Sequence, residues 1–538
     1  MKTLSLSLSL FYSILLSSIL NAQIVQEYVN LDGNNIRSFF INTGILDQNI
    51  TQNNAPGYEW PKGMGTHAIF TAGLTIAAKI NGQLRMAAAS YEGEYAPGYS
   101  DNGQAFTNSN FKLYRVRFGD NQFTNPDYAN WGMMVPYGAP YVDVNNNGIY
   151  EAAIDTPGVR GAIQTIFLCM TDGFASQHNS GEGFGGGTAP LYAEVHMTAW
   201  CYNTMGLEDV QFVKWDVINK SGSTWNGTIL SLVTDPDLGS ATDDWIGCDT
   251  SSNLGYCYNS DNTDGNGEPG TYGASPPAVG ITFLKTPTNS SNKEFGLSSF
   301  TFFNNFSTPG AGCENGADSP IQAYNYMKGL KSDGTKWVNP LSMTTTKYCY
   351  TGNPETGVGW TESDGKIGNC GGDTTGSVVQ SPGGDRRMVM SIADSLYNLS
   401  AGQQVTIAVS QQIARGSNNL NSVIKLKLLE NTIRSFWQTI GISPISTEVP
   451  ETFRLHQNYP NPFNPSTKIR FDVPGNKEFV KLIIYDISGR EVAKLVNQEL
   501  APGVYEYDFN SGTLSSGMYF YKLEAGNYSE IKKMVLVK

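Results

Sequence analysis

The sequence predicts an all-β protein in two parts. The first is a large β-sandwich-like region with long loops and one C-terminal helix, and the second is a small Ig-like antiparallel β-sandwich. Short apolar runs with alternating polarity recur along most of the 538 residues. Glycine, asparagine, serine and threonine separate these runs, as turns require. Only one long segment, near residue 420, has apolar side chains at helical spacing.

The first 22 residues are typical of a secretory signal peptide. Lys2 gives a positive start, Leu4 to Leu20 is apolar and rich in serine, and Ala22 offers a small residue before cleavage. A membrane anchor is the alternative, but the run is short and no stop-transfer charge follows it. Because no later apolar run could span a bilayer, we expect no transmembrane segment in the mature chain.

The sequence pattern of residues 23–440 predicts a β-rich region without an internal repeat. Residues 250–385 are rich in glycine, asparagine, threonine and proline, which predicts long loops on the main sheets or a small inserted lobe. The expected strands are Ala68–Ile80, Phe111–Phe118, Gln164–Met170, Ala193–Tyr202, Val210–Ile218, Thr228–Val233, Gly280–Leu284 and Val405–Val409.

The single predicted helix lies just before a predicted domain boundary. Asn418 or Asn419 can cap its start. Residues 441–450, with Pro444 and Pro450, predict a linker. The expected apolar face of the helix, which would pack on a sheet, consists of Leu420, Ile424, Leu428, Leu429, Ile433, Phe436 and Trp437.

Residues 451–538 predict six or seven short strands in an antiparallel sandwich. Ile469, Phe471 and Val473 alternate with polar residues, as in a half-buried strand. The proline and asparagine cluster at 460–465 is expected in a loop or at an edge. An ordinary Ig-like spacer is one interpretation of this part.

Several motifs favour a second interpretation. They are Asn458-Tyr459-Pro460-Asn461-Pro462-Phe463-Asn464-Pro465, Gly489-Arg490-Glu491-Val492, Ser516-Gly517-Met518-Tyr519 and the basic-apolar tail Lys532–Lys538. Together they resemble the type A C-terminal sorting domain of proteins exported by the type IX secretion system. The resemblance implies that residues 23–440 are cargo and that 451–538 contact the export machinery. It also implies a secreted or outer-surface protein that passes through the periplasm, with possible attachment to surface lipopolysaccharide after processing.

Charge is distributed unevenly along the chain. The net charge is −13, and residues 451–538 hold eleven basic and ten acidic residues, so the first 450 residues carry −14. Such acidity disfavours nucleic acid as a partner, because phosphates must be met by lysine and arginine. It favours bound cations, or simply solubility.

Seven cysteines are present, and none forms a C-x-x-C pair, which disfavours a zinc ribbon or a redox motif. Passage through the periplasm permits disulfides. Cys248–Cys257 is a plausible local bridge, and Cys313, Cys349 and Cys370 could supply another.

The segment from Asp143 to Asp155 predicts a calcium loop. The candidate ligands are Asp143, Asn145, Asn147, the Ile149 carbonyl, Glu151 and Asp155, and Gly148 permits the sharp turn. The pattern resembles EF-hand and dockerin loops, but its twelfth position is Ile154 and the acid comes one residue later. The residues before it predict a strand, so we infer no EF-hand. An asparagine-glycine turn without metal is the alternative.

A second acidic cluster consists of Asp235, Asp237, Asp243, Asp244 and Asp249. So many carboxylates would repel one another unless they were solvated or bridged by a cation, so a metal site and a solvated loop are both open. This block resembles a segment that recurs in large uncharacterised type IX cargo proteins. A third, weaker candidate consists of Asp261, Asp264, Asn266 and Glu268.

Catalytic motifs are scarce. The sequence has no H-E-x-x-H, no G-x-S-x-G and no P-loop. We therefore predict no catalytic residues, and His178, in a glycine-rich loop, is the only histidine that merits a test. Trp245 and Trp360 could stack on sugar rings, although core packing is the more common role. The favoured function is a non-catalytic, cation-stabilised protein in adhesion, matrix or glycan contact. A secreted hydrolase acting on polysaccharide or peptide is the alternative.

Overall fold

The computed structural model describes residues 24–537 apart from 146, 180, 290–292, 306–311, 373–375, 395, 441, 447–449, 451, 465, 476–477, 501 and 512–513. The expected signal peptide, Met1–Ala22, lies outside the described residues.

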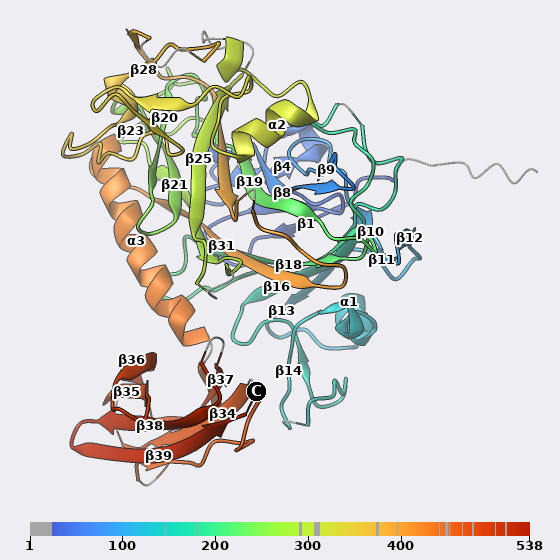
Figure 1. The fold of residues 1–538 in the computed structure, drawn as a ribbon, viewed down its shortest axis with the longest axis vertical. Helices are drawn as coiled ribbons and strands as arrows, with labels where there is room; N and C mark the ends of the chain where they lie inside the picture. The colour runs from blue at the N-terminus through green and yellow to red at the C-terminus, as the bar shows by residue number, and fades with distance from the viewer. Residues whose placement is uncertain are drawn as a thin grey trace, which may run out of the picture.

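Two large antiparallel sheets form the first part of the described chain (Figure 1). One has eight strands in the order β1-β2-β3-β8-β19-β30-β25, with β9 paired to β8. Their bounds are β1 Tyr28–Leu31, β2 Ser38–Ile41, β3 Ile45–Leu46, β8 Thr71–Ile80, β9 Gln83–Ala87, β19 Asn226–Asp235, β25 Leu297–Asn304 and β30 Arg386–Ile392.

The other large sheet has nine strands in the order β10-β16-β17-β18-β31-β24-β21-β20, with β13 paired to β16. Their bounds are β10 Ala96–Pro97, β13 Tyr114–Arg117, β16 Gln164–Thr171, β17 Ala193–Cys201, β18 Val210–Asn219, β20 Asp244–Asp249, β21 Leu254–Asn259, β24 Ala278–Lys285 and β31 Gln404–Ala414.

The main core lies between these two sheets. Leu232 and Met390 from the first sheet join Val213, Ile281 and Ile407 from the second in one buried cluster. Burial of such apolar surface is the main driving force for this packing. The predicted all-β sandwich is confirmed, and each of the eight predicted strands overlaps an observed strand.

Short two-stranded ladders decorate the loops of the sandwich. They pair β4 Gln48–Asn49 with β5 Ala55–Pro56, β6 Tyr58–Glu59 with β7 His67–Ile69, β11 Tyr99–Asp101 with β12 Gln104–Phe106, β14 Tyr141–Val142 with β15 Thr156–Pro157, β22 Thr263–Asp264 with β23 Gly273–Ala274, β26 Trp337–Asn339 with β27 Thr344–Thr346, and β28 Lys366–Ile367 with β29 Val378–Val379.

The expectation of loops over 250–385 was wrong for part of this range. Strands β21 and β25, which were not predicted, belong to the two large sheets, as does β24, which was predicted as Gly280–Leu284. Serine, threonine and glycine interrupt their apolar residues, which reduces the apolar signal in the sequence although the strands are buried. After β25, helix α2 (Pro320–Met327) contacts β25, β30 and β19. With β26 to β29, it forms a small lobe on the eight-stranded sheet.

One disulfide, Cys313–Cys370, closes a 57-residue separation inside this lobe. It is one of the pairings that the sequence left open. The expected Cys248–Cys257 bridge is absent from the described residues, and both thiols are free. In the β20–β21 ladder Cys248 lies opposite Gly255 and Cys257 opposite Ile246, so the two cysteines are not directly paired across the strands.

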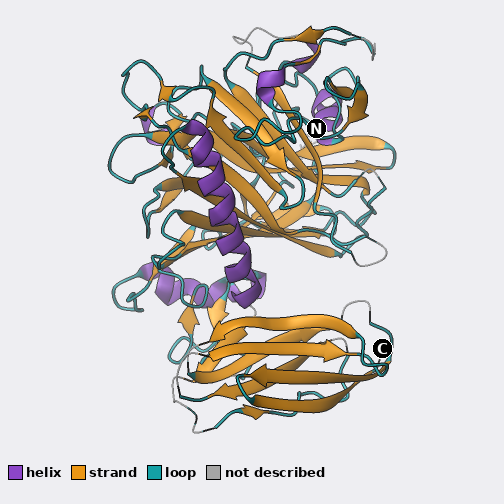
Figure 2. Cartoon of the chain, turned by 90° about the vertical axis from the view of Figure 1, so that its left-hand side faces the viewer, coloured by secondary structure: helices purple, strands orange, loops and turns teal. Residues whose placement is uncertain are grey.

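The predicted helix is α3, Asn419–Ile440, which runs along the nine-stranded sheet against β21, β24 and β31 (Figure 2). The Asn418 side chain accepts a hydrogen bond from the Asn421 backbone N–H at 2.8 Å, as a cap should. The predicted apolar face was wrong at Leu428, which is 54% exposed. Ile433 of the predicted face is fully buried, and Val423 and Leu426, which were not predicted, are buried beside it.

Three short helical segments precede the loop at 143–155, namely α1 (Pro126–Asn130), η2 (Trp131–Met133) and η3 (Val135–Tyr137). Short 3₁₀ turns also occur at η1 (Ile50–Gln52), η4 (Gly312–Glu314) and η5 (Glu362–Asp364).

The C-terminal part is a sandwich of two four-stranded sheets, β32-β37-β34-β33 and β36-β35-β38-β39. Phe471, Leu482 and Tyr521 are in its separate core. The bounds are β32 Ile442–Ser446, β33 Arg454–Leu455, β34 Ser466–Val473, β35 Glu478–Tyr485, β36 Glu491–Leu500, β37 Gly503–Asn510, β38 Gly517–Ala525 and β39 Tyr528–Leu536.

The linker predicted at 441–450 was wrong at its centre, where β32 pairs antiparallel with β37. Pro444 lies opposite Tyr505, and the register shifts between Pro444 and Ser446. Since β32 is an edge strand of its sheet, a proline without an N–H is tolerated there. Residues 441 and 447–449 lie outside the described part.

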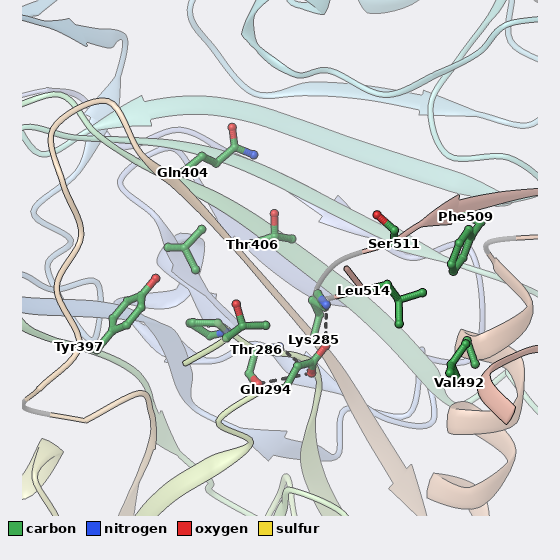
Figure 3. Close-up of a pocket in the computed structure, with 14 residues that line it drawn as sticks. Lys285, Thr286, Glu294, Tyr397, Gln404, Thr406, Val492, Phe509, Ser511 and Leu514 are labelled. Carbon is green, nitrogen blue, oxygen red and sulfur yellow. Dashed lines mark hydrogen bonds and ion pairs between the residues drawn. The ribbon is translucent and has the colours of Figure 1, made fainter. Parts of the chain in front are cut away.

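A pocket of about 660 Å³ lies between the large sandwich and the terminal domain (Figure 3). Lys285, Tyr397 and Thr406 line it from the sandwich, and Phe509 and Leu514 line it from the terminal domain. Lys285 and Glu294 form an ion pair of 2.5 Å in it, and both side chains are more than 40% exposed.

Candidate cation sites

The loop from Asp143 to Asp155 lies at the tip of a short hairpin. Val142 in β14 pairs with Thr156 in β15, directly outside the loop. The loop therefore joins two strands, as expected, and not two helices. Gly148 has a φ of +75°, which supports the sharp turn assigned to it.

The loop closes on itself through its own oxygen atoms. The two Asp143 oxygens accept the backbone N–H groups of Asn147 (3.2 Å) and Gly148 (2.7 Å). The two oxygens of buried Asp155 accept those of Val144 (2.8 Å) and Glu151 (2.7 Å). The side-chain carboxylate of Glu151 accepts the side-chain amides of Asn145 (2.6 Å) and Asn147 (2.5 Å). Ile149 is 66% exposed.

A more compact carboxylate group lies on the eight-stranded sheet. Asp235 ends β19, Asp237 follows two residues later, and Asp385 directly precedes β30. One oxygen from each lies within 4.8 Å of the other two. The sequence predicted the first two residues and missed Asp385. Asp385 is distant from Asp235 in the sequence. The only sequence feature that could have indicated it is the charged run Asp385-Arg386-Arg387 at the start of an apolar strand.

Arg387 forms ion pairs with this group. Its guanidinium contacts Asp235 at 3.0 Å and Asp385 at 2.5 Å. The Tyr91 hydroxyl accepts a hydrogen bond from Arg387 Nε at 2.7 Å and donates to Asp235 at 2.8 Å. Within the described residues, the other Asp235 oxygen is buried without a hydrogen-bond partner.

The charges in this group are not balanced. Burial raises the pKa of Asp235 to about 7, against the lowering effect of Arg387, and the charge of Asp385 raises it further. Burial, followed by the charges of Asp235 and Asp385, holds the pKa of Asp237 well above its usual range. One guanidinium thus contacts two of the three carboxylates, and a divalent cation would neutralise the negative charge that remains.

The remaining predicted carboxylates of this block lie apart from the group. Asp244 is fully buried and accepts the Leu238 N–H at 3.1 Å, and Asp243 accepts the Gly265 N–H at 2.9 Å. Asp249 accepts the Ser251 N–H in an exposed turn. These side chains organise loops, and in the described chain they do not join Asp235 and Asp237 in one site.

The third candidate cluster is also spread over its loop. Asp264 accepts the N–H of Ser240 at 2.8 Å and that of Tyr272. Asp261 and Glu268 each close a local turn. Gly239 lies so close to Asp264 that an added Cβ would come within 1.8 Å of its oxygen, so glycine is required there.

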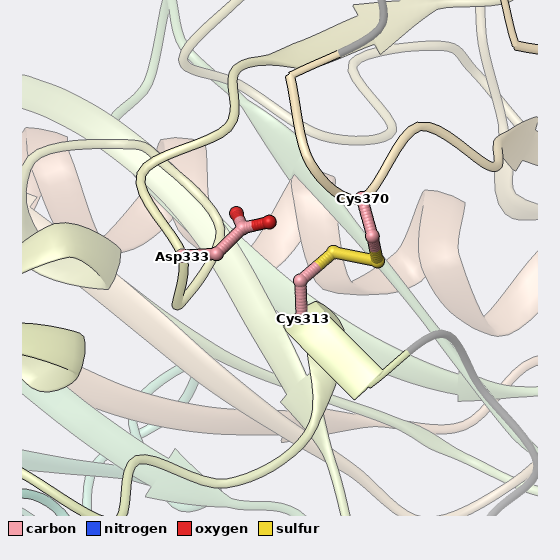
Figure 4. Close-up of side chains that lie close together, drawn as sticks. All are labelled: Cys313, Asp333 and Cys370. Carbon is pink, nitrogen blue, oxygen red and sulfur yellow. A yellow bond between two sulfur atoms is a disulfide. The ribbon is translucent and has the colours of Figure 1, made fainter.

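A fourth group, Cys313, Asp333 and Cys370, has close sulfur and oxygen atoms (Figure 4). Its two sulfurs are bonded to each other, so neither is a thiolate that could bind a metal. Asp333 accepts the Gly371 N–H at 2.9 Å and so anchors the same loop.

His178 is enclosed by carboxylates and is 2% exposed in its side chain. Its Nδ1 lies 3.4 Å from Glu94, and its Nε2 lies 2.8 Å from the Asp172 carbonyl and 3.5 Å from the Asp172 carboxylate. Burial lowers the pKa of His178, but hydrogen bonds and charges of Asp172 and Glu94 raise it to about 10. The imidazolium therefore holds two loops together.

We expect His178 to make stability depend on pH. Its folded-state pKa, about 10, exceeds the ordinary value of 6.5. Its contribution is therefore complete below about pH 6.5 and is lost as pH rises toward 10, by up to about 1.4 kcal/mol per pH unit. Between pH 6 and pH 9, the unfolding free energy measured with urea should fall more in the parent protein than in His178→Gln. Equal losses in the two proteins would refute this role.

Comparison with protein families identifies one part of the chain. Residues 457–538 match the family described as the secretion system C-terminal sorting domain. No curated protein matches the sequence. One solved structure, described as a polysaccharide lyase, has 7% sequence identity and a TM-score of 0.18. The match covers 64% of this chain and about a third (34%) of that structure, and it carries no functional argument.

A large all-β region followed by a sorting domain defines a class of exported proteins. The chain is a cargo protein of the type IX secretion system. Its destination is the cell surface or the exterior of the cell. In the part of the chain that the structure describes, every helix is too short or too polar to cross a membrane.

Proposed function

We propose that residues 23–440 form a non-catalytic, cation-stabilised protein that acts outside the cell in adhesion, matrix or glycan contact. The observation that supports this proposal best is the Asp235, Asp237 and Asp385 group. It brings three carboxylates from two chain segments to one place. A cation bound there would tie the end of β19 to the start of β30.

Calcium suits this group better than magnesium. Carboxylate oxygens at flexible distances are the ligands that Ca²⁺ accepts, whereas Mg²⁺ demands a small, nearly ideal octahedron. The loop at 143–155 is the second proposed calcium site. Its oxygens now bind N–H groups of the same loop, so calcium would compete with those hydrogen bonds. In the Asp235 group one oxygen of Asp235 is buried without a hydrogen-bond partner among the described residues, so this group would bind the ion more tightly.

We expect calcium to raise the Tm of the secreted protein and a chelator to lower it. Binding to the folded state alone adds about 2.7 kcal/mol at a hundredfold excess over Kd. Asp385→Asn should remove most of this response if the three-carboxylate group dominates, and Asp143→Ala should remove it if the loop dominates. Asp249→Asn, outside both sites, is the matched control. A parent protein that does not respond to calcium would refute the proposal.

The three-carboxylate group also supports the second candidate, a secreted hydrolase. Retaining glycosidases use two carboxyl groups about 5–5.5 Å apart, one with a raised pKa, and Asp235 and Asp237 have these features in part. Of the two tryptophans, Trp360 is 1% exposed and packs against Tyr350, whereas Trp245 is partly exposed. A glycan-binding and glycan-cleavage screen separates the candidates, because glycan binding without cleavage fits a contact role and cleavage fits a hydrolase.

The proposed role outside the cell includes attachment to surface lipopolysaccharide after processing.

A further inference from the structure

Asp47 places a carboxylate in the interior of the large sandwich. It lies between β3 and β4, is 0% exposed, and has a φ of +67°. Its backbone N–H donates to the Phe39 carbonyl at 2.7 Å. Gly57 packs so closely that an added Cβ would come within 2.3 Å of the Asp47 carbonyl. The backbone at this position is therefore fixed from two sides.

The Asp47 side chain reaches the opposite sheet. Gln411 in β31 donates its amide to Asp47 Oδ2 at 2.6 Å. Asp47 Oδ1 and Gln411 Oε1 are both buried without a hydrogen-bond partner among the described residues, and so is the hydroxyl of the fully buried Tyr58. Tyr58 directly follows Gly57, whose backbone packs against the Asp47 carbonyl, so Tyr58 lies at the same corner of the sandwich. Burial raises the pKa of Tyr58, and the charge of Asp47 raises it further.

Two other buried carboxylates of this protein, Glu182 and Glu362, are compensated. Glu182 accepts four backbone N–H groups, from residues 90–93. Glu362 pairs with Arg386 at 2.9 Å. By contrast, Asp47 has one neutral amide donor, and no ion pair joins it to another described residue. A buried charge without a counterion costs several kcal/mol in general, so such groups bind a cation or become protonated.

The glutamine opposite Gln411 differs from it in having its whole amide satisfied. Gln211 lies opposite Gln411 in the β18–β31 ladder. It accepts from Ser38 at 2.5 Å and donates to the Leu31 carbonyl at 3.0 Å, so both ends of its amide are satisfied. Gln411, by contrast, uses its amide N–H on Asp47 and leaves its own oxygen without a partner among the described residues.

We propose that Asp47, Gln411 and Tyr58 bind a monovalent metal cation between the two sheets. The oxygens of a carboxylate, an amide and a hydroxyl are the ligand types that hard cations prefer. A single carboxylate balances a single positive charge, which favours Na⁺ or K⁺ over Ca²⁺. The site would fasten the β3–β4 corner of one sheet to β31 of the other.

The test uses the whole secreted protein, refolded with a calcium chelator in either NaCl or choline chloride at equal ionic strength. Sodium should give a saturable upward shift in Tm over choline, which is too large for the interior. Asp47→Asn should abolish this difference, and Asp32→Asn, in a partly exposed ion pair with Arg117, should retain it. The chelator separates this result from the calcium proposal, so either can fail alone.

Two outcomes would overturn the inference. The first is an identical Tm of the parent protein in sodium and choline, which requires no variant. The second is an Asp47→Asn protein that is more stable than the parent in both salts. That result would mean that Asp47 is an unpaired or protonated acid whose burial only costs stability.

Discussion

Removal of residues 451–538 is expected to leave the protein in the periplasm, with almost none at the surface or in the medium. This segment contains the whole sorting-domain match and folds around its own core. Its removal should therefore eliminate the export signal and leave the core of the large sandwich intact. Cell fractionation followed by immunoblotting measures the outcome.

The Asp235→Asn protein with an intact terminal domain is the control for this experiment, and it should reach the surface. A truncated protein delivered at the parent level would contradict the assignment of 451–538 as the sorting domain.

Arg386→Ala should lose about 3–5 kcal/mol of unfolding free energy, because it leaves a buried carboxylate without its cation. Arg386 is 1% exposed and Glu362 is fully buried. Glu362 also accepts hydrogen bonds from the Ile246 N–H at 2.8 Å and the Ser381 hydroxyl at 2.7 Å. This pair therefore connects β30, β20 and the lobe, and urea unfolding measures its loss.

Two companion variants sharpen this test. Glu294→Ala breaks the exposed pair with Lys285 and should cost less than about 1 kcal/mol. Replacing both Arg386 and Glu362 with apolar residues of similar volume should cost less than Arg386→Ala, because no charge remains buried. If Arg386→Ala costs no more than Glu294→Ala, the burial argument is wrong.

Local patterns predicted most of the architecture. Burial of one face of a strand produces the alternation of Ile469, Phe471 and Val473. Burial also produces the dense apolar runs of β16 to β19. Both patterns involve only residues that are neighbours in the sequence. The Asn418 cap is local in the same way. These features could be predicted without knowing which strands pair.

The Asp235 group and the Asp47 site depend on long-range pairing, whereas the loop at 143–155 is local. Asp385 joins Asp235 because β19 and β30 are neighbours in the sheet, with Thr234 opposite Met388. Asp47 meets Gln411 across two layers. A local sequence pattern does not show which distant residues come into contact. The face of α3 was misjudged at Leu428 because several apolar stripes fit one helix, and only the sheet decides which is buried.

The pairing of β32 with β37 has a consequence for any protease that separates the terminal domain from the sandwich. A cut before Ile442 would release a domain whose sheet is complete. A cut after Ser446 would leave β32 attached to α3 and expose the backbone N–H and C=O groups of β37 along one side. Such an unpaired edge is a template for the strand of another molecule. The position of the cut would therefore decide whether the released domain stays monomeric or tends to self-associate.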